Sequence, residues 1–156
     1  MHTEFREAVL PGEIRALQAF DRRVFPPADR FPADYWKQLQ SFWLLVDRVK
    51  AGCCAFQPHT DFERETQVRG CLYIASTAIL PRFQGRGLGR LMKAWQIAFA
   101  ERHGFERIVT NTRKRNRAMI RLNESFGFEV IRVTPRYYSD PTDATVVMQL
   151  RLERKR

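Results

Sequence analysis

The first helices of the chain are predicted by the spacing of its apolar residues. Their three- and four-residue intervals indicate an amphipathic helix over residues 11–24, which a proline pair at positions 26 and 27 ends. The apolar face consists of Ile14, Leu17, Phe20 and Val24. A short second helix is expected over residues 33–40.

Apolar stretches of strand length follow. Residues 42–46 and 49–56 predict two strands joined by an Asp47-Arg48 turn, and the polar residues 57–69 predict a loop. The stretch from Cys71 to Leu80 carries no charge and ends at Pro81. It therefore predicts a central strand that is buried on both faces.

Strands and helices alternate in the second half of the chain. Helices are expected over residues 87–103 and from Asn116, as N-cap, to Gly127, as C-cap. Strands are expected over residues 108–112, 129–134 and 145–152, with 137–143 as the last loop. The fold class is therefore α/β, with a mixed central sheet of about six to seven strands and about four helices.

Length and composition fit one globular domain. The 156 residues are 44% hydrophobic, which indicates a single domain over residues 1–156 with a short basic tail at 153–156. No apolar run approaches the ~20 residues that span a bilayer, and the N-terminus lacks the apolar segment of a signal peptide. We therefore expect a cytoplasmic protein that does not associate with membranes.

Cysteines and net charge narrow the chemistry. Cys53, Cys54 and Cys71 have no metal-binding spacing and are expected to be reduced, so no metal is predicted. The formal net charge of +10 favours an anionic partner. Nucleic acid, a phosphorylated cofactor and an acidic protein surface all fit the charge.

A glycine-rich turn over residues 84–89 lies between the predicted buried strand and the helix that follows it. Unpaired amides at a helix N-terminus and glycines without side chains together form a cradle for a pyrophosphate. Arg82, Arg86, Arg90 and Lys93 add positive charge. The turn lacks the Gly-Lys-Ser/Thr of a Walker loop and the glycine spacing of a dinucleotide-binding loop.

Two motifs carry a resemblance to a known family. Gln84, Gly87 and Gly89 match the pattern Q/R-x-x-G-x-G/A, and residues 116–128 resemble N-x-x-x-I-x-L-Y-x-x-x-G-F. In this order and at this distance they resemble the GNAT family of N-acetyltransferases. The resemblance implies a single-domain fold in which the strands over residues 71–80 and 107–112 splay apart, with acetyl-CoA as co-substrate.

The same resemblance assigns the cofactor contacts. The backbone of Ala78, Ile79 and Leu80 would hold the pantetheine arm, and the Ile79 amide would polarise the thioester carbonyl. Asn116 would contact the pantetheine. The amides that would bind the pyrophosphate belong to Gln84, Gly85, Arg86, Gly87, Leu88, Gly89 and Arg90.

Two residues depart from the family pattern. Asn123 stands where the family often has a tyrosine as general acid, and Asn111 stands where relatives that acetylate protein N-termini often have a glutamate. No Asp or Glu occurs from Gln67 to Ala100, so an ordered water is the expected proton acceptor, with Tyr73 and Ser76 as supports.

A tyrosine pair resembles the last hairpin of those N-terminal acetyltransferases. Tyr137 or Tyr138 could line the acceptor site or supply the missing acid, or both could simply cover a loop. Since neighbouring side chains on a strand point to opposite faces, one of the two is expected to face the reactants.

The predicted function is transfer of an acetyl group from acetyl-CoA to an amine by direct attack in a ternary complex. The sequence does not identify the amine, which can be a small molecule or a peptide. It also leaves open whether the protein forms a homodimer. One alternative is a CoA-binding protein with weak catalysis. A lesser alternative is nucleic-acid binding through the basic residues Arg113, Lys114, Arg115, Arg117 and Arg121 and the tail.

Overall fold

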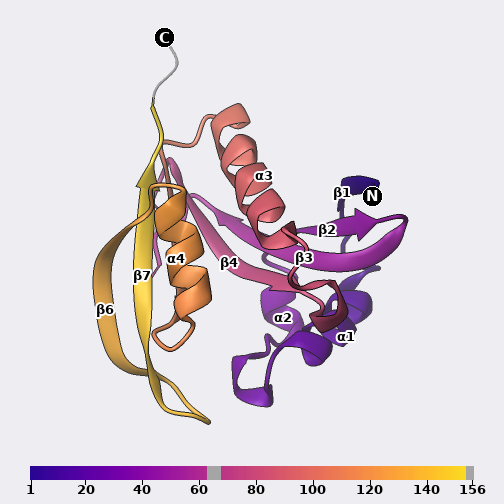
Figure 1. The fold of residues 1–156 in the computed structure, drawn as a ribbon, viewed down its shortest axis with the longest axis horizontal. Helices are drawn as coiled ribbons and strands as arrows, with labels where there is room; N and C mark the ends of the chain where they lie inside the picture. Colours follow the sequence, from indigo (N-terminus) through magenta and orange to yellow (C-terminus); the bar gives the residue numbers. More distant parts are fainter. Residues whose placement is uncertain (63–67, 154–156) are drawn as a thin grey trace. The chain divides into compact units, whose positions relative to one another are not determined.

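The computed structural model describes residues 1–62 and 68–153 (Figure 1). Of the predicted basic tail, residues 154–156 lie outside the described residues. The strands are β1 Thr3–Glu7, β2 Gln40–Val46, β3 Val49–Pro58, β4 Cys71–Ile79, β5 Arg107–Arg113, β6 Glu129–Tyr138 and β7 Asp143–Arg151. The helices are α1 Ile14–Val24, α2 Ala33–Trp36, α3 Leu88–Arg102 and α4 Arg117–Ser125, with 3-10 turns η1 Pro27–Asp29 and η2 Pro81–Phe83.

The sheet is mixed and has seven strands in the order β1-β2-β3-β4-β5-β7-β6, which confirms the predicted α/β class. The chain packs as two compact units, residues 1–57 with 75–88 and residues 58–74 with 89–156. Strand β4 contributes to both units. Its parallel pairing with β5 runs only from Cys71 to Ile74, so the predicted splay of these two strands begins there.

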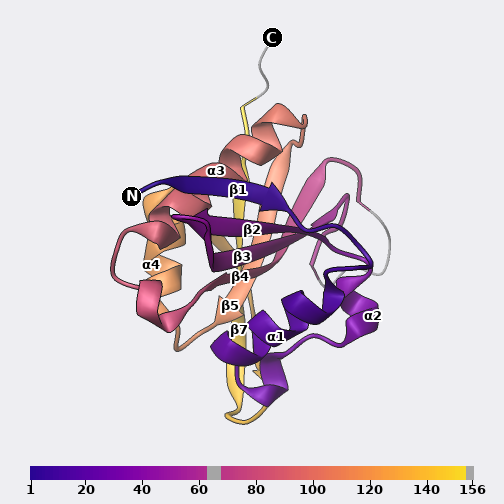
Figure 2. The same ribbon diagram turned by 90° about the vertical axis from the view of Figure 1, so that its right-hand side faces the viewer.

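The first unit contains the antiparallel strands β1, β2 and β3 (Figure 2). Asp47 and Arg48 both have positive φ values, 47° and 69°, as a tight two-residue hairpin turn requires, which confirms the predicted turn. Strand β1 was not predicted. Its sequence, Thr-Glu-Phe-Arg-Glu, is mostly charged because β1 lies at the edge of the sheet, and pairing with β2 stabilises it.

Helix α1 packs on the strands of this unit. It begins at Ile14, three residues later than predicted, because Glu13 turns back to accept hydrogen bonds from the Val9 amide and from Trp43 Nε1, the latter at 3.0 Å. Phe20 contacts the Trp43 ring edge-on at 5.6 Å. Helix α2 is a single turn, shorter than predicted.

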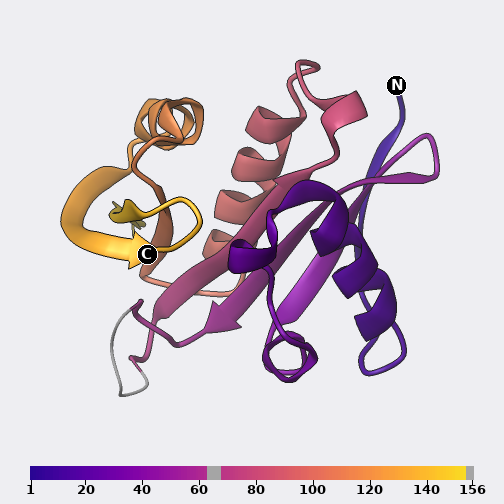
Figure 3. The ribbon, with the colours of Figure 1, turned by 90° about the horizontal axis from the view of Figure 1, so that it is seen from below.

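The second unit is built on β5, β7 and β6, and the central strand β7 pairs antiparallel with both β5 and β6 (Figure 3). Its core contains Ile108, Val109, Val147 and Met148, none of which is exposed. Strand β6 extends to Tyr138 and β7 begins at Asp143, so the predicted loop over residues 137–143 is shorter. The tyrosine pair therefore lies at the end of a strand.

The buried face of α3 differs from the prediction. Leu88, Met92 and Phe99 are buried as expected, whereas Leu91 and Trp95 are only half-buried. Lys93 and Gln96 take their place in the interior at 1% and 0% exposure. Because the Lys93 ammonium lies over the Phe128 ring at 5.3 Å, it does not add exposed charge to the glycine-rich turn.

The three cysteines are free and buried, as predicted. Desolvation raises the pKa of the Cys71 thiol to about 11 and that of Cys53 well above its usual range. These two thiols therefore stay protonated and unreactive at neutral pH. None of the helices in the described part of the chain combines the length and apolarity that a bilayer crossing requires.

We predict that Asp21→Asn does not destabilise the fold at neutral pH. The Asp21 carboxylate is 5% exposed and accepts a hydrogen bond from the Phe31 amide at 2.9 Å, and desolvation raises its pKa. An asparagine oxygen can accept the same hydrogen bond without a buried charge. A carboxyl whose pKa is raised by folding stabilises the fold at low pH, and this contribution is lost as pH rises through its folded pKa.

Melting temperatures of both proteins between pH 4 and pH 8 test this prediction. The melting temperature of the variant should rise relative to that of the wild type as the pH rises, and Asp34→Asn, at an exposed carboxylate on α2, is the control. The prediction would be contradicted if the melting temperature of the wild type rose relative to that of the Asp21 variant with increasing pH.

Candidate functional site

The glycine-rich turn joins β4 to α3 through η2. Gly85 and Gly87 have φ values of 78° and 79°, a region that favours glycine. A Cβ atom built on either residue would meet nothing within 4 Å, so the space in front of the turn is open. Among the residues that the structure describes, the amides of residues 85–88 have no backbone partner. These amides at a helix N-terminus are suited to an anion.

The side chain of Gln84 closes this turn. Its Nε2 donates a hydrogen bond to the Ile79 carbonyl at 3.0 Å, which ties the turn to the end of β4. Gln84, which matches the sequence motif, thus stabilises the turn through its side chain. An anion would be bound by the backbone amides that follow Gln84.

The end of β4 has one edge paired with β3. The Leu80 amide donates to the Ala51 carbonyl at 2.9 Å and so already has a partner. Because the N–H and C=O of one strand residue share a side and alternate along the strand, Ala78 also faces β3, whereas the Ile79 amide faces the opposite edge. Of the three predicted pantetheine contacts, Ile79 is therefore the one directed to the edge that β5 leaves after Ile74.

Three exposed arginines lie in or next to the turn. The guanidinium groups of Arg82 and Arg86 lie over the Phe83 ring, 4.7 and 5.4 Å from its centre, and this ring is only 8% exposed. Arg90 lies over the Phe126 ring at 4.8 Å and donates to Ser125 Oγ at 3.1 Å. Aromatic support holds each guanidinium in place without neutralising its charge.

The two asparagines of α4 have different surroundings. Asn116 is exposed, and its Oδ1 accepts from the Met119 amide at 3.3 Å, which confirms it as the N-cap and leaves its NH2 group for another partner. Asn123 is 1% exposed and donates from Nδ2 to the Met148 sulfur at 3.7 Å. Its Oδ1 has no hydrogen-bond partner in the described part of the chain. Asn123 is thus enclosed between α4 and β7.

A cluster of hydrogen-bonded polar side chains connects β4, β5, β6 and β7. The Tyr73 hydroxyl donates to Asn111 Oδ1, and Asn111 Nδ2 donates to Tyr138 Oη at 3.0 Å and to Thr145 Oγ1 at 3.1 Å. The Tyr138 and Thr145 hydroxyls are 3.2 Å apart. Sequence reasoning treated Asn111 only as an absent carboxylate and missed Thr145, because the cluster depends on the pairing of β5 with β7.

The two tyrosine rings do not diverge as a regular strand predicts. They contact each other edge-on, with centres 4.8 Å apart, where the register of β6 shifts and Arg136 has a φ of 52°. Their burial nevertheless differs. Tyr138 is half-buried in the polar cluster, whereas Tyr137 is 46% exposed and contacts the Phe62 ring edge-on at 5.5 Å. Phe62 in turn stacks on Tyr73 at 5.2 Å. Of the remaining candidates, Ser76 is half-buried in β4, and His59 accepts the Gly70 amide at 3.1 Å in a structural contact.

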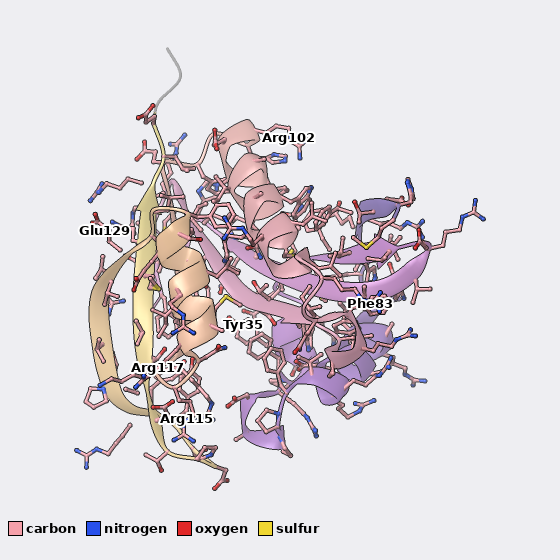
Figure 4. All side chains as sticks on the ribbon, in the orientation of Figure 1. Tyr35, Phe83, Arg102, Arg115, Arg117 and Glu129 are labelled. Atoms are coloured by element: carbon pink, nitrogen blue, oxygen red, sulfur yellow. The ribbon has the colours of Figure 1, made fainter. Side chains whose placement is uncertain are left out.

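Two arginines clamp the β6–β7 hairpin, and Figure 4 places Arg115 beside it. Arg113 donates to the carbonyls of Pro141 and Ser139 at 2.6 and 2.9 Å, and its guanidinium lies over the Tyr138 ring at 4.5 Å. Arg115 donates to Asp143 Oδ2 from both its amide and Nε at 3.1 Å. These two arginines of the predicted basic cluster are therefore used within the fold.

The charge of Asp143 is stabilised at this clamp. Desolvation opposes its ionisation, but hydrogen bonds from the Arg115 and Ala144 amides and the Arg115 guanidinium outweigh it, so the pKa of Asp143 lies below its usual range. The clamp fixes the residues that follow Tyr138 and so fixes where β6 ends.

Comparison with known proteins identifies the family of the chain. The model of the acetyltransferase (GNAT) family matches residues 13–128. The ribosomal-protein-S18-alanine N-acetyltransferase from Escherichia coli has a similar structure, with a TM-score of 0.82 and 20% identity over 99% of this chain and 97% of that one. Among curated proteins, none matches the sequence.

Two further solved structures share the fold. The protein yncA from Salmonella typhimurium, solved with its cofactor acetyl-CoA, has a TM-score of 0.78 and 21% identity over 100% of this chain and 97% of that one. The ribosomal-protein-alanine N-acetyltransferase from Brucella melitensis has a TM-score of 0.75 and 19% identity over 96% of this chain and 99% of that one.

We predict that Asp143→Asn loosens the hairpin. The change removes the negative charge that the Arg115 guanidinium contacts, so the melting temperature should fall. A carboxyl whose pKa is lowered by folding stabilises the fold above its unfolded pKa, about 3.9, and this contribution is lost as pH falls through its folded pKa. The difference between wild type and variant should therefore shrink in acid.

Thermal unfolding at pH 7 and pH 3 measures the effect. The control is Asp140→Asn, because Asp140 is an exposed residue of the same hairpin with a φ of 45° that asparagine also tolerates. Equal melting temperatures of the wild type and the Asp143 variant at pH 7 would show that the clamp does not depend on this charge.

Proposed function

Because the chain belongs to the acetyltransferase (GNAT) family, we propose that it transfers the acetyl group of acetyl-CoA to an amine by direct attack. The observation that carries this proposal is the open turn over residues 84–88 at the N-terminus of α3. Its glycines have positive φ, the amides of residues 85–88 have no backbone partner in the described chain, and exposed arginines accompany it.

In this proposal the cofactor is held mainly by backbone groups. The amides from Gly85 to Arg90 bind the pyrophosphate, and Arg82 and Arg86 add charge. The Ile79 amide donates to the thioester carbonyl and stabilises the negative charge that develops on its oxygen. The exposed NH2 group of Asn116 contacts the pantetheine.

The chemical step requires a neutral amine. Its nitrogen lone pair attacks the thioester carbon, the carbon–sulfur bond breaks with its electron pair passing to sulfur, and the nitrogen loses a proton. No carboxylate occurs between Gln67 and Ala100, so a water accepts that proton. The departing thiolate, whose thiol has a pKa of ~8.5, needs a hydrogen-bond donor.

We assign this donor to the Tyr138 hydroxyl. Tyr138 is half-buried and belongs to a hydrogen-bonded cluster. Asn123, in contrast, is enclosed between α4 and β7 and donates a hydrogen bond to the Met148 sulfur. Tyr137, with its exposed ring, contributes apolar surface to the acceptor site.

Protein or peptide N-termini are the first acceptor class to test. This choice rests on the solved N-acetyltransferases of similar fold, whose named substrates are ribosomal-protein alanines. Small-molecule amines form the second class. Binding of CoA without turnover is the rival function, which the asparagines at positions 111 and 123 favour. Nucleic-acid binding has less support, since Arg113 and Arg115 hold the hairpin.

We predict that Gly89→Glu weakens CoA binding at least tenfold, on the order of 1.4 kcal/mol, because a carboxylate would stand at the anion site. Gly89 suits this test better than Gly87, where any side chain is strained by the positive φ. Calorimetric titration with CoA measures the affinity, and ADP should compete if the pyrophosphate is the anchor.

Gly89→Ala is the matched control. A Cβ atom at this position lies 3.5 Å from Leu122 Cδ2, an ordinary contact, and alanine favours a helix over glycine by up to about 1 kcal/mol. This variant should fold and bind CoA. If the Glu variant binds CoA as tightly as the Ala variant, the turn is not the pyrophosphate site.

We predict that Tyr138→Phe lowers kcat about tenfold or more while the KM for the amine is kept, because a donor to the leaving thiolate acts only in the transition state. Tyr137→Phe should retain most of kcat, since the ring that contacts Phe62 is preserved. Thiol release from acetyl-CoA with a panel of N-terminal peptides and small amines measures both constants. A raised KM at constant kcat in Tyr138→Phe would instead assign Tyr138 to acceptor binding.

A further inference from the structure

We propose that Asn111 is a positioning residue that makes the Tyr138 hydroxyl a hydrogen-bond donor toward the reactants. This inference rests on the proposed function and adds a residue to it. Asn111 does so by donating to the Tyr138 oxygen at 3.0 Å, so the phenolic proton cannot point toward Asn111.

The direction of the Asn111 amide is determined by its neighbours. The Thr145 hydroxyl donates to the Thr112 carbonyl at 3.4 Å, so Thr145 Oγ1 is available to Asn111 only as an acceptor. The NH2 group of Asn111 must therefore face Thr145 and Tyr138, and its carbonyl oxygen must face the Tyr73 hydroxyl. If the amide were flipped, the Asn111 carbonyl oxygen would face the Thr145 hydroxyl. The single Thr145 proton could then reach either this oxygen or the Thr112 carbonyl, and the other acceptor would lose it.

The Tyr138 proton can then be donated to Thr145 or to the reactants. At rest the hydroxyl can donate to Thr145 Oγ1 at 3.2 Å, which has a second lone pair for it. When the reactants are bound, the same proton can turn to them while the hydrogen bond from Asn111 is kept. A hydroxyl that accepts a hydrogen bond is polarised and becomes a stronger donor.

The surroundings keep this arrangement rigid. Thr145 is 0% exposed and Tyr73 is 6% exposed, so water does not compete for their hydroxyls. The Phe62 ring stacks on Tyr73, and the Arg113 guanidinium lies over the Tyr138 ring. A carboxylate in place of Asn111 would accept from Tyr138 instead and draw its proton away from the reactants.

The sharpest variant is therefore Asn111→Asp, which has nearly the same shape and reverses the hydrogen bond. Thiol release from acetyl-CoA should show kcat lowered on the order of tenfold or more, with the KM for acetyl-CoA unchanged. In a Tyr138→Phe background the same substitution should have little further effect, since no phenolic proton remains to be directed.

Asn111→Ala provides a second route if the aspartate variant does not fold. It removes the donor without adding a charge, and its loss of kcat should also vanish in the Tyr138→Phe background. Melting temperatures of each variant separate a misfolded protein from an inactive one.

Each outcome has a defined meaning. If kcat is unchanged or raised in Asn111→Asp, or if the losses from positions 111 and 138 multiply independently, Asn111 does not act through Tyr138 and the inference is wrong. If the wild type turns over no amine at all, the proposed function fails and the inference fails with it. Turnover by the wild type together with coupled losses supports both.

Discussion

The structure depends on the short pairing between β4 and β5. These parallel strands are hydrogen-bonded only from Cys71 to Ile74, and β4 continues to Ile79 with its other edge bonded to β3. A strand that is paired on one side exposes a row of backbone donors and acceptors on the other. In the proposed function, the Ile79 amide at the end of this strand binds the cofactor.

The turn after β4 extends the same principle. Gly85 and Gly87 adopt positive φ, Gln84 ties the turn back to the Ile79 carbonyl, and α3 begins at Leu88. In the proposed function, the backbone supplies the binding groups in both places, and side chains hold that backbone in position. The fold itself is shared with solved acetyltransferases at about 20% identity.

The end that carries the proposed chemistry is built differently, from side chains. Arg113 and Arg115 hold the β6–β7 hairpin, and the clamp keeps Tyr138 within a strand beside Asn111 and Thr145. The two asparagines that depart from the expected family pattern are not equivalent. Asn123 is enclosed in the core, whereas Asn111 is the centre of a polar cluster.

The sequence alone determined what depends on neighbours along the chain. The hairpin turn at Asp47-Arg48, the Asn116 cap and the glycine turn follow from local backbone preferences, and the α/β order follows from apolar spacing. Strand β1, the interior place of Lys93 and the strand position of the tyrosines could not be predicted, because partners distant in sequence stabilise them. Only the pairing of β5 with β7 brings Asn111 to Thr145, since strand register is set by the sheet as a whole.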